Sequence, residues 1–225
     1  MRSIPAKLVT WDEIAEWCSS LGDMIVGSGY RPDAVIGLAR GGWVPSRLIC
    51  DELVSKNLIS LKTQHWGVTA SKDGTARLVG GIQEDIAGKD VLIIDDITDT
   101  GDSLRLAHEH AASMSAGTVR TATMLHITHS KFVPDYFAKE VVKENWTWFV
   151  FPWNYYEDMS TFIREILAER PLREREIGSL LRKNHGILMS EGRLSRTLAR
   201  LELLGLIRKN EDAWNLIVEE KQESQ

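Results

Sequence analysis

Two neighbouring carboxylates, Asp95 and Asp96, directly follow four aliphatic residues at positions 91–94. Carboxylates in such a place can accept hydrogen bonds from sugar hydroxyls or bind a metal ion. A short loop at residues 99–103 comes next, and a helix is expected to begin at Ser103. Backbone N–H groups and the dipole at a helix N-terminus favour a bound phosphate. The stretch therefore predicts an anion site with this acidic pair (Asp95 and Asp96) beside it.

A second candidate loop is Arg40-Gly41-Gly42, which follows an apolar run at residues 33–39. Its glycines can expose backbone amides to phosphate oxygens, and Arg40 adds positive charge. Apolar runs such as 33–39 and 91–94 are typical of strands buried on both faces of a parallel sheet. Ligands bind at the carboxyl ends of the strands in such sheets. Both loops are therefore expected at the same edge.

Hydrophobic periodicity predicts the elements that position these loops. Strands are expected at residues 33–39, 58–66, 91–94 and 118–127, and helices at 11–27, 45–55, 103–114 and 158–170. Two further strands, at 136–142 and 146–151, are expected to be joined by a turn around Glu144. Residues 67–81 are interpreted as a loop or weak hairpin. The alternation of strands and helices predicts an α/β domain with a parallel sheet over residues 1–170.

The tail from Pro171 onward has a different pattern. Two short amphipathic helices, with Leu180 and Leu194 on their apolar faces, precede a hairpin at residues 206–217. Helix, helix and hairpin resemble a winged-helix module, so residues 171–225 are predicted to form a second domain. Three arginines, at positions 193, 196 and 200, share one face of the second helix. That face could enter the major groove of DNA, or it could be an ordinary solvated face.

Composition narrows the class of protein. The chain has 225 residues, of which 43% are apolar, so it can bury a core. Its net charge of −5 argues against a protein that coats nucleic acid. Cys18 and Cys50 have no metal-ligand spacing and are expected to be reduced thiols. No apolar run approaches a membrane span and charges interrupt the first 30 residues, so a cytoplasmic protein is expected.

The stretch from residue 91 to residue 104 resembles the phosphoribosyl-diphosphate signature of the type I phosphoribosyltransferases. The resemblance rests on the aliphatic run, the acidic pair, and Thr100-Gly101 followed by Ser103. It implies the type I phosphoribosyltransferase fold, a Rossmann-like parallel sheet flanked by helices. It also implies that Asp95 and Asp96 bind the ribose hydroxyls and take part in binding Mg²⁺. The 5′-phosphate would be bound by the loop residues, which are Asp99, Thr100, Gly101, Asp102 and Ser103.

Asp99 indicates the class of base within this family. An acidic residue before Thr-Gly is usual in enzymes for 6-oxopurines, where the carboxylate can take the N7 proton as N9 attacks the sugar. Asp99 could instead cap the following helix or tighten the turn. The resemblance also makes Arg40, Gly41 and Gly42 the diphosphate loop, with a cis peptide bond between Arg40 and Gly41. Lys72, in the loop at 67–81, is expected to close on diphosphate.

The base would be bound from a different part of the chain. Lys131 resembles the lysine that donates to the base O6, and Trp148 resembles the aromatic residue that stacks on the ring. Phe149 would offer backbone contacts. The stretch around Trp148 is similar to that of the xanthine–guanine enzymes, except that Asn154 replaces the acid after Pro-Trp. The contact to the C2 position is therefore left open.

The sequence thus predicts a purine salvage enzyme that joins hypoxanthine, guanine or xanthine to phosphoribosyl diphosphate with Mg²⁺. A homodimer is expected from the family. The alternative is a transcriptional regulator that senses phosphoribosyl diphosphate or a nucleotide and binds DNA through residues 171–225. The presence of Asp99, Lys131 and the Arg40-Gly41-Gly42 loop favours catalysis.

Overall fold

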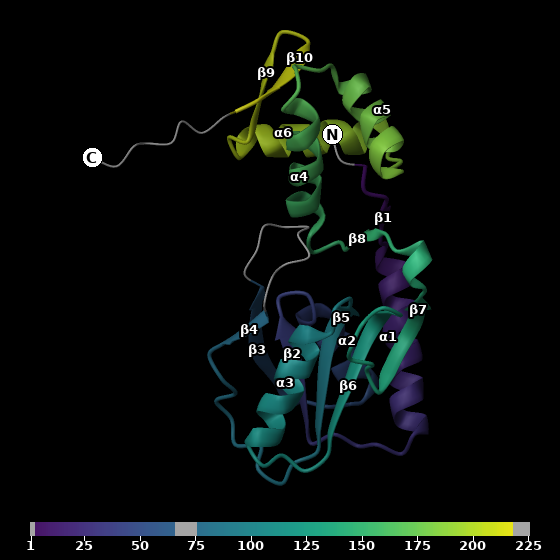
Figure 1. The fold of residues 1–225 in the computed structure, drawn as a ribbon, viewed down its shortest axis with the longest axis vertical. Helices are drawn as coiled ribbons and strands as arrows, with labels where there is room; N and C mark the ends of the chain where they lie inside the picture. Colours follow the sequence, from purple (N-terminus) through teal and green to yellow (C-terminus); the bar gives the residue numbers. More distant parts are fainter. Residues whose placement is uncertain (1–2, 66–75, 218–225) are drawn as a thin grey trace, which may run out of the picture. The chain divides into compact units, whose positions relative to one another are not determined.

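The computed structural model describes residues 3–65 and 76–217, which pack as two compact units. One unit comprises residues 11–146, and the other comprises residues 3–10 together with 147–217. Each unit has its own β-structure and its own helices (Figure 1). Segments from both ends of the chain therefore belong to one unit.

The unit of residues 11–146 is built around a six-stranded sheet. Its elements are α1 (Trp11–Gly27), β2 (Ala34–Ala39), α2 (Trp43–Glu52), β3 (Leu58–His65), β4 (Ala76–Val79), β5 (Val91–Thr98), α3 (Asp102–Ser113), β6 (Val119–Ile127), β7 (Tyr136–Val141) and the 3-10 helix η1 (Lys143–Asn145). The strand order is β4-β3-β2-β5-β6-β7. All neighbouring strands run parallel except β4, which is antiparallel to β3. The predicted α/β architecture with a mostly parallel sheet is confirmed.

Helices cover both faces of this sheet. Helix α3 lies on one face and α1 and α2 lie on the other (Figure 1). The aliphatic run of β5 has side chains on both sides, because successive residues of a strand point to opposite faces. Val91 and Ile93 join the core under α3, together with Leu104 and Ala107 of that helix. All four residues of the run are fully buried, as a central parallel strand requires.

The order of the strands reverses between β2 and β5. From β2 the chain proceeds to β3 on one side, whereas β5 is followed by β6 and β7 on the other. Loops that leave β2 and β5 diverge at such a switch point and open a crevice at the carboxyl edge of the sheet. The loops that leave these two strands are residues 40–42 and 99–101. The fold thus brings together the two loops that the sequence singles out.

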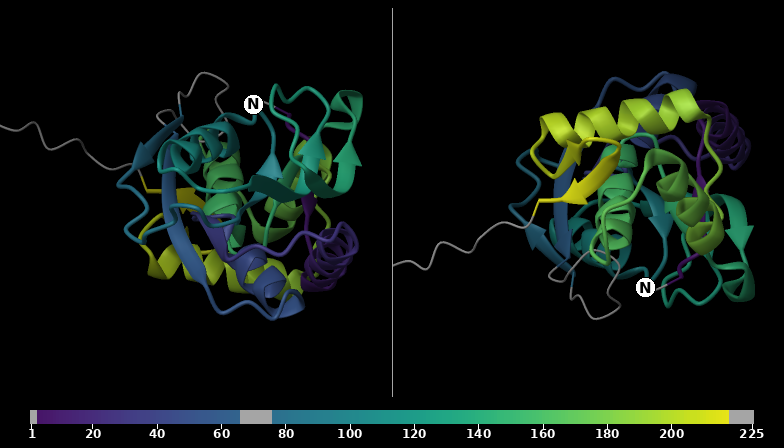
Figure 2. Two further views of the ribbon diagram at one scale, coloured as in Figure 1. Left: turned by 90° about the horizontal axis from the view of Figure 1, so that it is seen from below. Right: turned by 90° about the horizontal axis from the view of Figure 1, so that it is seen from above.

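The second unit has two small β-structures and three helices. Its elements are β1 (Ala6–Leu8), β8 (Trp148–Val150), α4 (Tyr155–Leu167), α5 (Glu174–His185), α6 (Glu191–Leu203), β9 (Ile207–Asn210) and β10 (Ala213–Leu216). Strand β1 pairs in parallel with β8, and β9 and β10 form an antiparallel hairpin. The hairpin and α6 are seen from above in the right panel of Figure 2. The predicted order of helix, helix and hairpin is present, and its assignment to the winged-helix class stays a prediction.

One core joins α4 to the tail. The apolar face of α4, with Phe162 and Ile163, is buried in the same cluster as Leu181 of α5 and Leu198 of α6. The sequence placed the helix at 158–170 in the first domain and began the second at residue 171. The compact units divide the chain between Trp146 and Thr147 instead. Whether residues 171–225 form an independent domain stays a prediction.

One sequence expectation about strands is wrong. Strand β5 does not end at the acidic pair, because pairing with β6 continues as far as Thr98 and His126. The strands expected at 136–142 and 146–151 are present as β7 and β8, and the turn between them is η1. Strand β7 pairs with β6 in the large sheet, and β8 pairs with β1 in the other unit. Periodicity identifies a strand but not its partner, so the sequence did not indicate either pairing.

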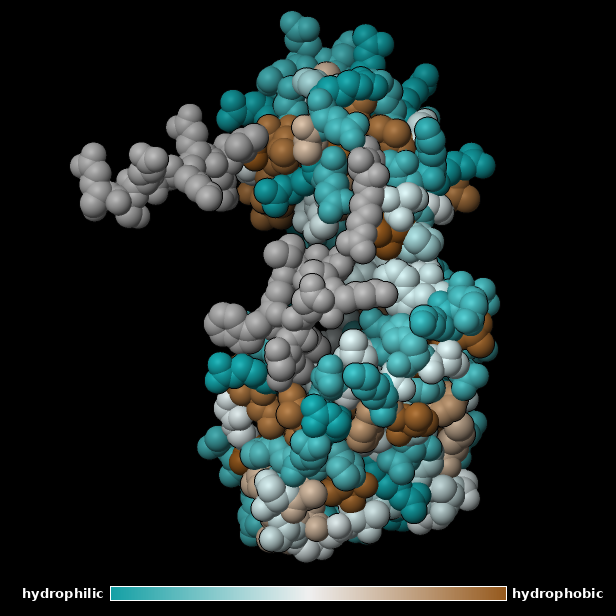
Figure 3. All heavy atoms as spheres, in the orientation of Figure 1, coloured by the Kyte–Doolittle hydropathy of each residue, from teal (hydrophilic) through white to brown (hydrophobic). Residues whose placement is uncertain are grey.

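Hydrophilic residues are spread over the face of both units that Figure 3 shows. Hydrophobic residues on that face occur as separate patches rather than as a continuous band. Among residues 3–65 and 76–217, none of the helices is long and apolar enough to cross a membrane.

Deletion of residues 171–225 is expected to unfold α4. The deletion would expose buried apolar side chains of this helix, among them Met159, Phe162, Ile163, Ile166 and Leu167. Burial of each large apolar side chain contributes about 1.5–3 kcal/mol, and a whole domain is stable by only about 5–15 kcal/mol. Limited proteolysis with mass spectrometry should show cleavage within residues 155–167 of the truncated chain and not of the full chain. A truncated chain that is equally resistant there would show that α4 does not depend on the tail.

Candidate active site

The glycine loop, residues 40–42, lies against the acidic pair. A Cβ atom built on Gly41 would stand 2.1 Å from Oδ2 of Asp96, and one built on Gly42 would stand 2.4 Å from the carbonyl oxygen of Ile94. No side chain fits at either position. The backbone N–H of Gly42 also donates to the carboxyl group of Asp95. The loop can therefore approach the strand only because both residues are glycine, and this confirms that the two sequence motifs adjoin.

A cis peptide bond occurs at the start of this loop, one residue earlier than the sequence predicted. It joins Ala39 to Arg40 rather than Arg40 to Gly41. Arg40 is exposed and stands where β2 ends.

The acidic pair lies within β5 and is electrostatically unfavourable when both groups are charged. Asp96 is 8% exposed. Burial of the Asp95 carboxyl group and the nearby charge of Asp96 raise the pKa of Asp95 well above its usual range. Hydrogen bonds from the backbone N–H groups of Asp96, at 3.0 Å, and of Gly42 oppose this effect. A cation bound beside the pair would relieve the repulsion.

Replacing Asp95 with Asn is expected to stabilise the chain at neutral and alkaline pH. The pKa of an aspartate in an unfolded chain is about 4, and the pKa of Asp95 in the folded chain is higher. The wild-type chain therefore loses stability relative to the neutral variant as pH rises through the folded-state pKa. We expect the melting temperature of the variant to exceed that of the wild type at pH 8, with the gain shrinking as pH falls toward 4; each 1 kcal/mol of difference corresponds to about 2–4 °C in a chain of this size.

Thermal unfolding in chelator-treated buffer, without substrate, measures this difference. Asp23→Asn, at an exposed position of α1, makes the same chemical change and should leave the melting temperature unaltered. An Asp95→Asn gain that is absent at pH 8, or that does not depend on pH, would contradict the electrostatic account of the pair.

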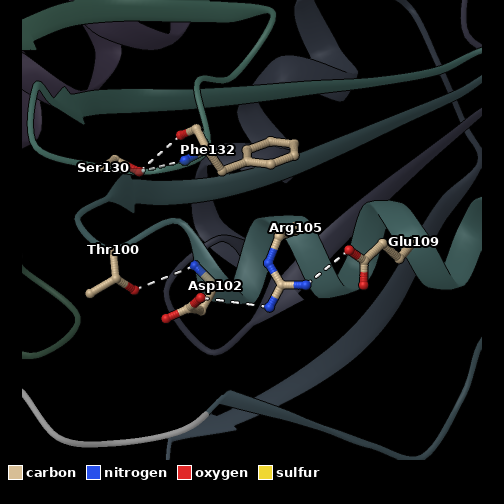
Figure 4. A network of polar contacts seen from close by, with 6 residues as sticks. All are labelled: Thr100, Asp102, Arg105, Glu109, Ser130 and Phe132. Carbon is tan, nitrogen blue, oxygen red and sulfur yellow. Dashed lines mark hydrogen bonds and ion pairs between the residues drawn. The ribbon is translucent and has the colours of Figure 1, made fainter.

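The phosphate loop, residues 99–103, leads from β5 into α3. Gly101 has a φ angle of +84°, a left-handed conformation that glycine adopts without strain. The backbone N–H of Asp102 lies 3.4 Å from the hydroxyl oxygen of Thr100 (Figure 4). Arg105 holds the start of the helix by reaching the carboxylates of Asp102, at 3.7 Å, and Glu109, at 2.9 Å. Ser103 is buried in the first turn of α3.

A second loop, residues 129–132, packs on the phosphate loop and is called the facing loop here. A Cβ atom on Gly101 would stand 2.6 Å from both Oγ of Ser130 and Cβ of Phe132. The Ser130 hydroxyl donates to the Phe132 carbonyl oxygen at 2.9 Å, so the facing loop is a closed turn (Figure 4). The backbone N–H of Lys131 donates to the carbonyl oxygen of Thr100 at 3.3 Å. Glycine is thus the only residue type that fits at position 101, between the two loops.

The hydrogen bond between Lys131 and Thr100 joins the loops that carry two predicted site residues, Asp99 and Lys131. The side chain of Lys131 is exposed. Nε2 of His129 lies 2.7 Å from Oδ1 of Asp99. The sequence does not point to His129, because a single histidine two residues past a strand carries no signal of its own. The spacing of about thirty residues between Asp99 and His129 is bridged only by the pairing of β5 with β6.

The remaining predicted residues lie elsewhere. Trp148 and Phe149 are half-buried in β8 of the other unit, where Phe149 stands opposite Lys7 of β1. Lys72 lies outside the described residues. Asn154, which stands where an acid was expected, immediately precedes α4.

A magnesium site would depend on substrate as well as protein. In the part of the chain that the structure describes, no three side chains among His, Cys, Asp and Glu converge as a metal site. Mg²⁺ is commonly bound by one or two carboxylates together with the phosphate oxygens of a substrate. The acidic pair, with the raised pKa of Asp95, fits that mode of binding.

The arginines of α6 are engaged in part within their own unit. The guanidinium of Arg193 lies over the ring of Tyr155, 4.4 Å from its centre, and that of Arg200 lies over Tyr156 at 5.3 Å. Both tyrosines belong to α4. Contacts of this kind stabilise the packing of α6 on α4. DNA binding through this face therefore stays a prediction that these contacts do not support.

Known proteins resemble the chain over most of this region. Residues 8–160 match the family model of the phosphoribosyl transferase domain. A xanthine-guanine phosphoribosyltransferase of Nitratidesulfovibrio vulgaris is 30% identical over 149 residues, which cover 65% of this chain and 83% of that protein. The crystal structure of a purine phosphoribosyltransferase from Pyrococcus horikoshii matches with a TM-score of 0.57 and 26% identity, over 66% of this chain and 93% of that one. A Helicobacter pylori xanthine-guanine-hypoxanthine phosphoribosyltransferase, at 15% identity and a TM-score of 0.56, shares the fold over 69% of this chain and 99% of its own.

Proposed function

The chain belongs to the phosphoribosyl transferase family, and we propose that it transfers the phosphoribosyl group of phosphoribosyl diphosphate to N9 of a 6-oxopurine. The acceptor would be hypoxanthine, guanine or xanthine, and the products would be the nucleoside 5′-monophosphate and diphosphate. The relatives whose names include purine, xanthine or guanine support this class of base.

The sugar and its phosphates would be bound at the switch point of the sheet. The phosphate loop would bind the 5′-phosphate at the N-terminus of α3, where the helix dipole favours negative charge. The acidic pair would accept hydrogen bonds from the ribose 2′- and 3′-hydroxyls and stabilise the positive charge that develops on the ring. The glycine loop would bind the diphosphate through its backbone and Arg40. Mg²⁺, when bound beside Asp95 and Asp96, would neutralise the charge of the leaving diphosphate.

Asp99 would act as the general base. As N9 attacks C1 of the ribose, the bond from C1 to the diphosphate oxygen breaks and the oxygen keeps the electron pair. The Asp99 carboxylate takes the proton from N7, so the purine ring of the product carries no positive charge. Such general-base help is typically worth about 10²–10⁴ in rate.

The base would be selected by the facing loop. Lys131 carries a positively charged donor, which pairs with an oxo group at C6 and would be repelled by the hydrogens of an amino group. Trp148 would stack on the purine and Phe149 would supply backbone contacts; these two roles rest on the resemblance of their stretch to the xanthine–guanine enzymes. Lys72 is proposed to reach the diphosphate, and this role also rests on the resemblance to the family.

One observation supports the 6-oxopurine proposal most strongly, namely the packing of the facing loop on the phosphate loop. Asp99 contacts His129, Thr100 accepts from the Lys131 backbone, and Gly101 lies against Ser130. The backbone of Lys131 is therefore held against the loop that carries Asp99, which supports the pairing of these two residues as O6 donor and general base.

A substrate panel tests the proposal. The full chain is incubated with Mg²⁺, phosphoribosyl diphosphate and, in turn, hypoxanthine, guanine, xanthine, adenine, orotate or uracil, and nucleotides are separated by chromatography. Nucleotide formed from one or more of the first three bases is expected. Product from adenine or orotate alone would overturn the substrate class, and tight ligand binding with no product from any base would favour a sensor protein.

A further inference from the structure

The two oxygens of the Asp99 carboxylate have different surroundings. Oδ1 is buried and faces Nε2 of His129 at 2.7 Å, yet 44% of the Asp99 side chain is exposed. The exposed part must therefore include the other oxygen, Oδ2. One oxygen is held inside the protein while the other remains accessible to a ligand.

We propose that His129 is a positioning residue for Asp99: its Nε2–H holds Oδ1, which leaves Oδ2 directed at the N7 proton of the base. The proposal rests on the proposed function, in which Asp99 is the general base. His129 does not itself touch the reacting atoms. It acts through Asp99, much as a buried carboxylate orients the histidine in serine proteases but with the two roles exchanged.

The tautomer of His129 follows from its second nitrogen. Nδ1 is buried and has no hydrogen-bond partner among the described residues. An unpaired buried N–H is costly, whereas an unpaired ring nitrogen with a lone pair is less so, which favours the tautomer with hydrogen on Nε2. That tautomer has its hydrogen on the nitrogen that lies 2.7 Å from Oδ1 of Asp99. It cannot pass a proton onward, because Nδ1 meets no acceptor, so His129 orients the carboxylate and does not relay its proton.

The contact between Nε2 of His129 and Oδ1 of Asp99 does not have the geometry of a hydrogen bond in this structure. Nε2 and Oδ1 are 2.7 Å apart, but Oδ1 has no hydrogen-bond partner of good geometry among the described residues. Catalytic hydrogen bonds of this kind often align only when the substrate binds. The protein does not fully enclose the ring, because 27% of the His129 side chain is exposed.

Few charged groups compete with Asp99 for His129. His126, at the end of β6, is the titratable neighbour that acts on it, and Glu140 of β7 acts on His126 in turn. Burial lowers the pKa of His126 and so disfavours a positive charge on this neighbour. Lys131, the charged residue of the same loop, has an exposed side chain. The carboxylate of Asp99 is the close partner of His129 among the described residues.

Paired substitutions test the role of His129. His129→Phe keeps the size and planarity of the ring but removes the donor, and His129→Gln places an amide N–H near the former Nε2. We expect His129→Phe to lower kcat by about tenfold or more, as loss of a hydrogen bond to a charged group does. The KM for phosphoribosyl diphosphate should change less than twofold, and His129→Gln should recover most of the loss. His110→Phe and His110→Gln, on α3, are the matched controls and should keep the wild-type kcat.

A double-mutant cycle separates orientation from general loss of structure. In the Asp99→Asn background, His129→Phe should lower kcat by less than twofold further, because its only route of action has been removed. Equal losses in both backgrounds, or no rescue by Gln with an unchanged melting temperature, would overturn the proposal.

A readout without activity keeps this test distinct from that of the proposed function. Long-range ¹H–¹⁵N correlation spectra of the imidazole groups identify the tautomer of His129 in the full chain, and Asp99→Asn should shift its Nε2 resonance. A neutral Nδ1–H tautomer, or no response to Asp99→Asn, would overturn the pairing even in an active enzyme. A wild-type chain that makes no nucleotide would overturn the proposed function, while the spectra would still decide whether His129 holds Asp99.

Discussion

Replacing Asp99 with Asn is expected to lower kcat by about 10²–10⁴-fold while phosphoribosyl diphosphate still binds. The amide keeps the size of the side chain, and its oxygen can still face the Nε2–H of His129. It cannot take the proton from N7, so positive charge would accumulate on the purine as N9 attacks. The backbone conformation of the phosphate loop depends on Gly101 rather than on the charge of Asp99, so the sugar phosphate should remain bound.

Steady-state kinetics with a 6-oxopurine, together with calorimetric titration of phosphoribosyl diphosphate and Mg²⁺, measure the two effects separately. Asp23→Asn is the control for the chemical change, because that residue is exposed on α1. A kcat within tenfold of wild type would remove Asp99 as the base. Loss of binding with no kinetic effect at saturation would make it a structural residue of the loop.

A comparable loss is expected from Gly41→Ala, but through binding. The added Cβ would stand 2.1 Å from Oδ2 of Asp96, a distance that non-bonded atoms do not reach. Either the glycine loop or the Asp96 carboxylate must move, and each is proposed to bind the sugar diphosphate. We expect kcat/KM for phosphoribosyl diphosphate to fall at least 100-fold, since misplacement of binding groups by about 1 Å can cost that much.

The control for this steric effect is Gly27→Ala at the end of α1, where an added Cβ meets no atom within 4 Å. It should keep the wild-type kcat/KM. Melting temperatures of both variants show whether the chain stays folded. A folded Gly41→Ala chain with kcat/KM within tenfold of wild type would refute the close packing of the glycine loop on the acidic pair as a requirement for activity.

The local motifs could be predicted because their chemistry is local. Residues 91–94 read as a buried strand and Gly101 as a backbone turn, and both are found. The glycine loop and the phosphate loop could also be placed at one edge, since parallel strands end on the same side. The acidic pair was placed beyond its strand, because sequence alone does not show that pairing with β6 continues past Asp96.

Long-range partners were the part that the sequence could not supply. The contact between His129 and Asp99 arises from two loops that only the finished sheet brings together. The pairing of β8 with β1 joins distant parts of the chain, and no pattern near Trp148 indicates it. The face of α6 that carries Arg193 looked like a free basic surface, whereas its guanidinium lies on Tyr155. Each case involves a partner chosen by tertiary packing rather than by local propensity.

The central claim, that the chain is a phosphoribosyltransferase for 6-oxopurines, is tested most directly by competition. Equal concentrations of hypoxanthine and adenine are supplied together with limiting phosphoribosyl diphosphate and Mg²⁺, and the two nucleoside monophosphates are quantified at the end of the reaction. We predict that the hypoxanthine nucleotide exceeds the adenine nucleotide by about tenfold or more, since a charged donor at Lys131 accepts an oxo group and rejects an amino group. An excess of the adenine nucleotide would contradict the claim, and so would a folded chain that makes no nucleotide from this mixture or from the same mixture with guanine or xanthine in place of hypoxanthine.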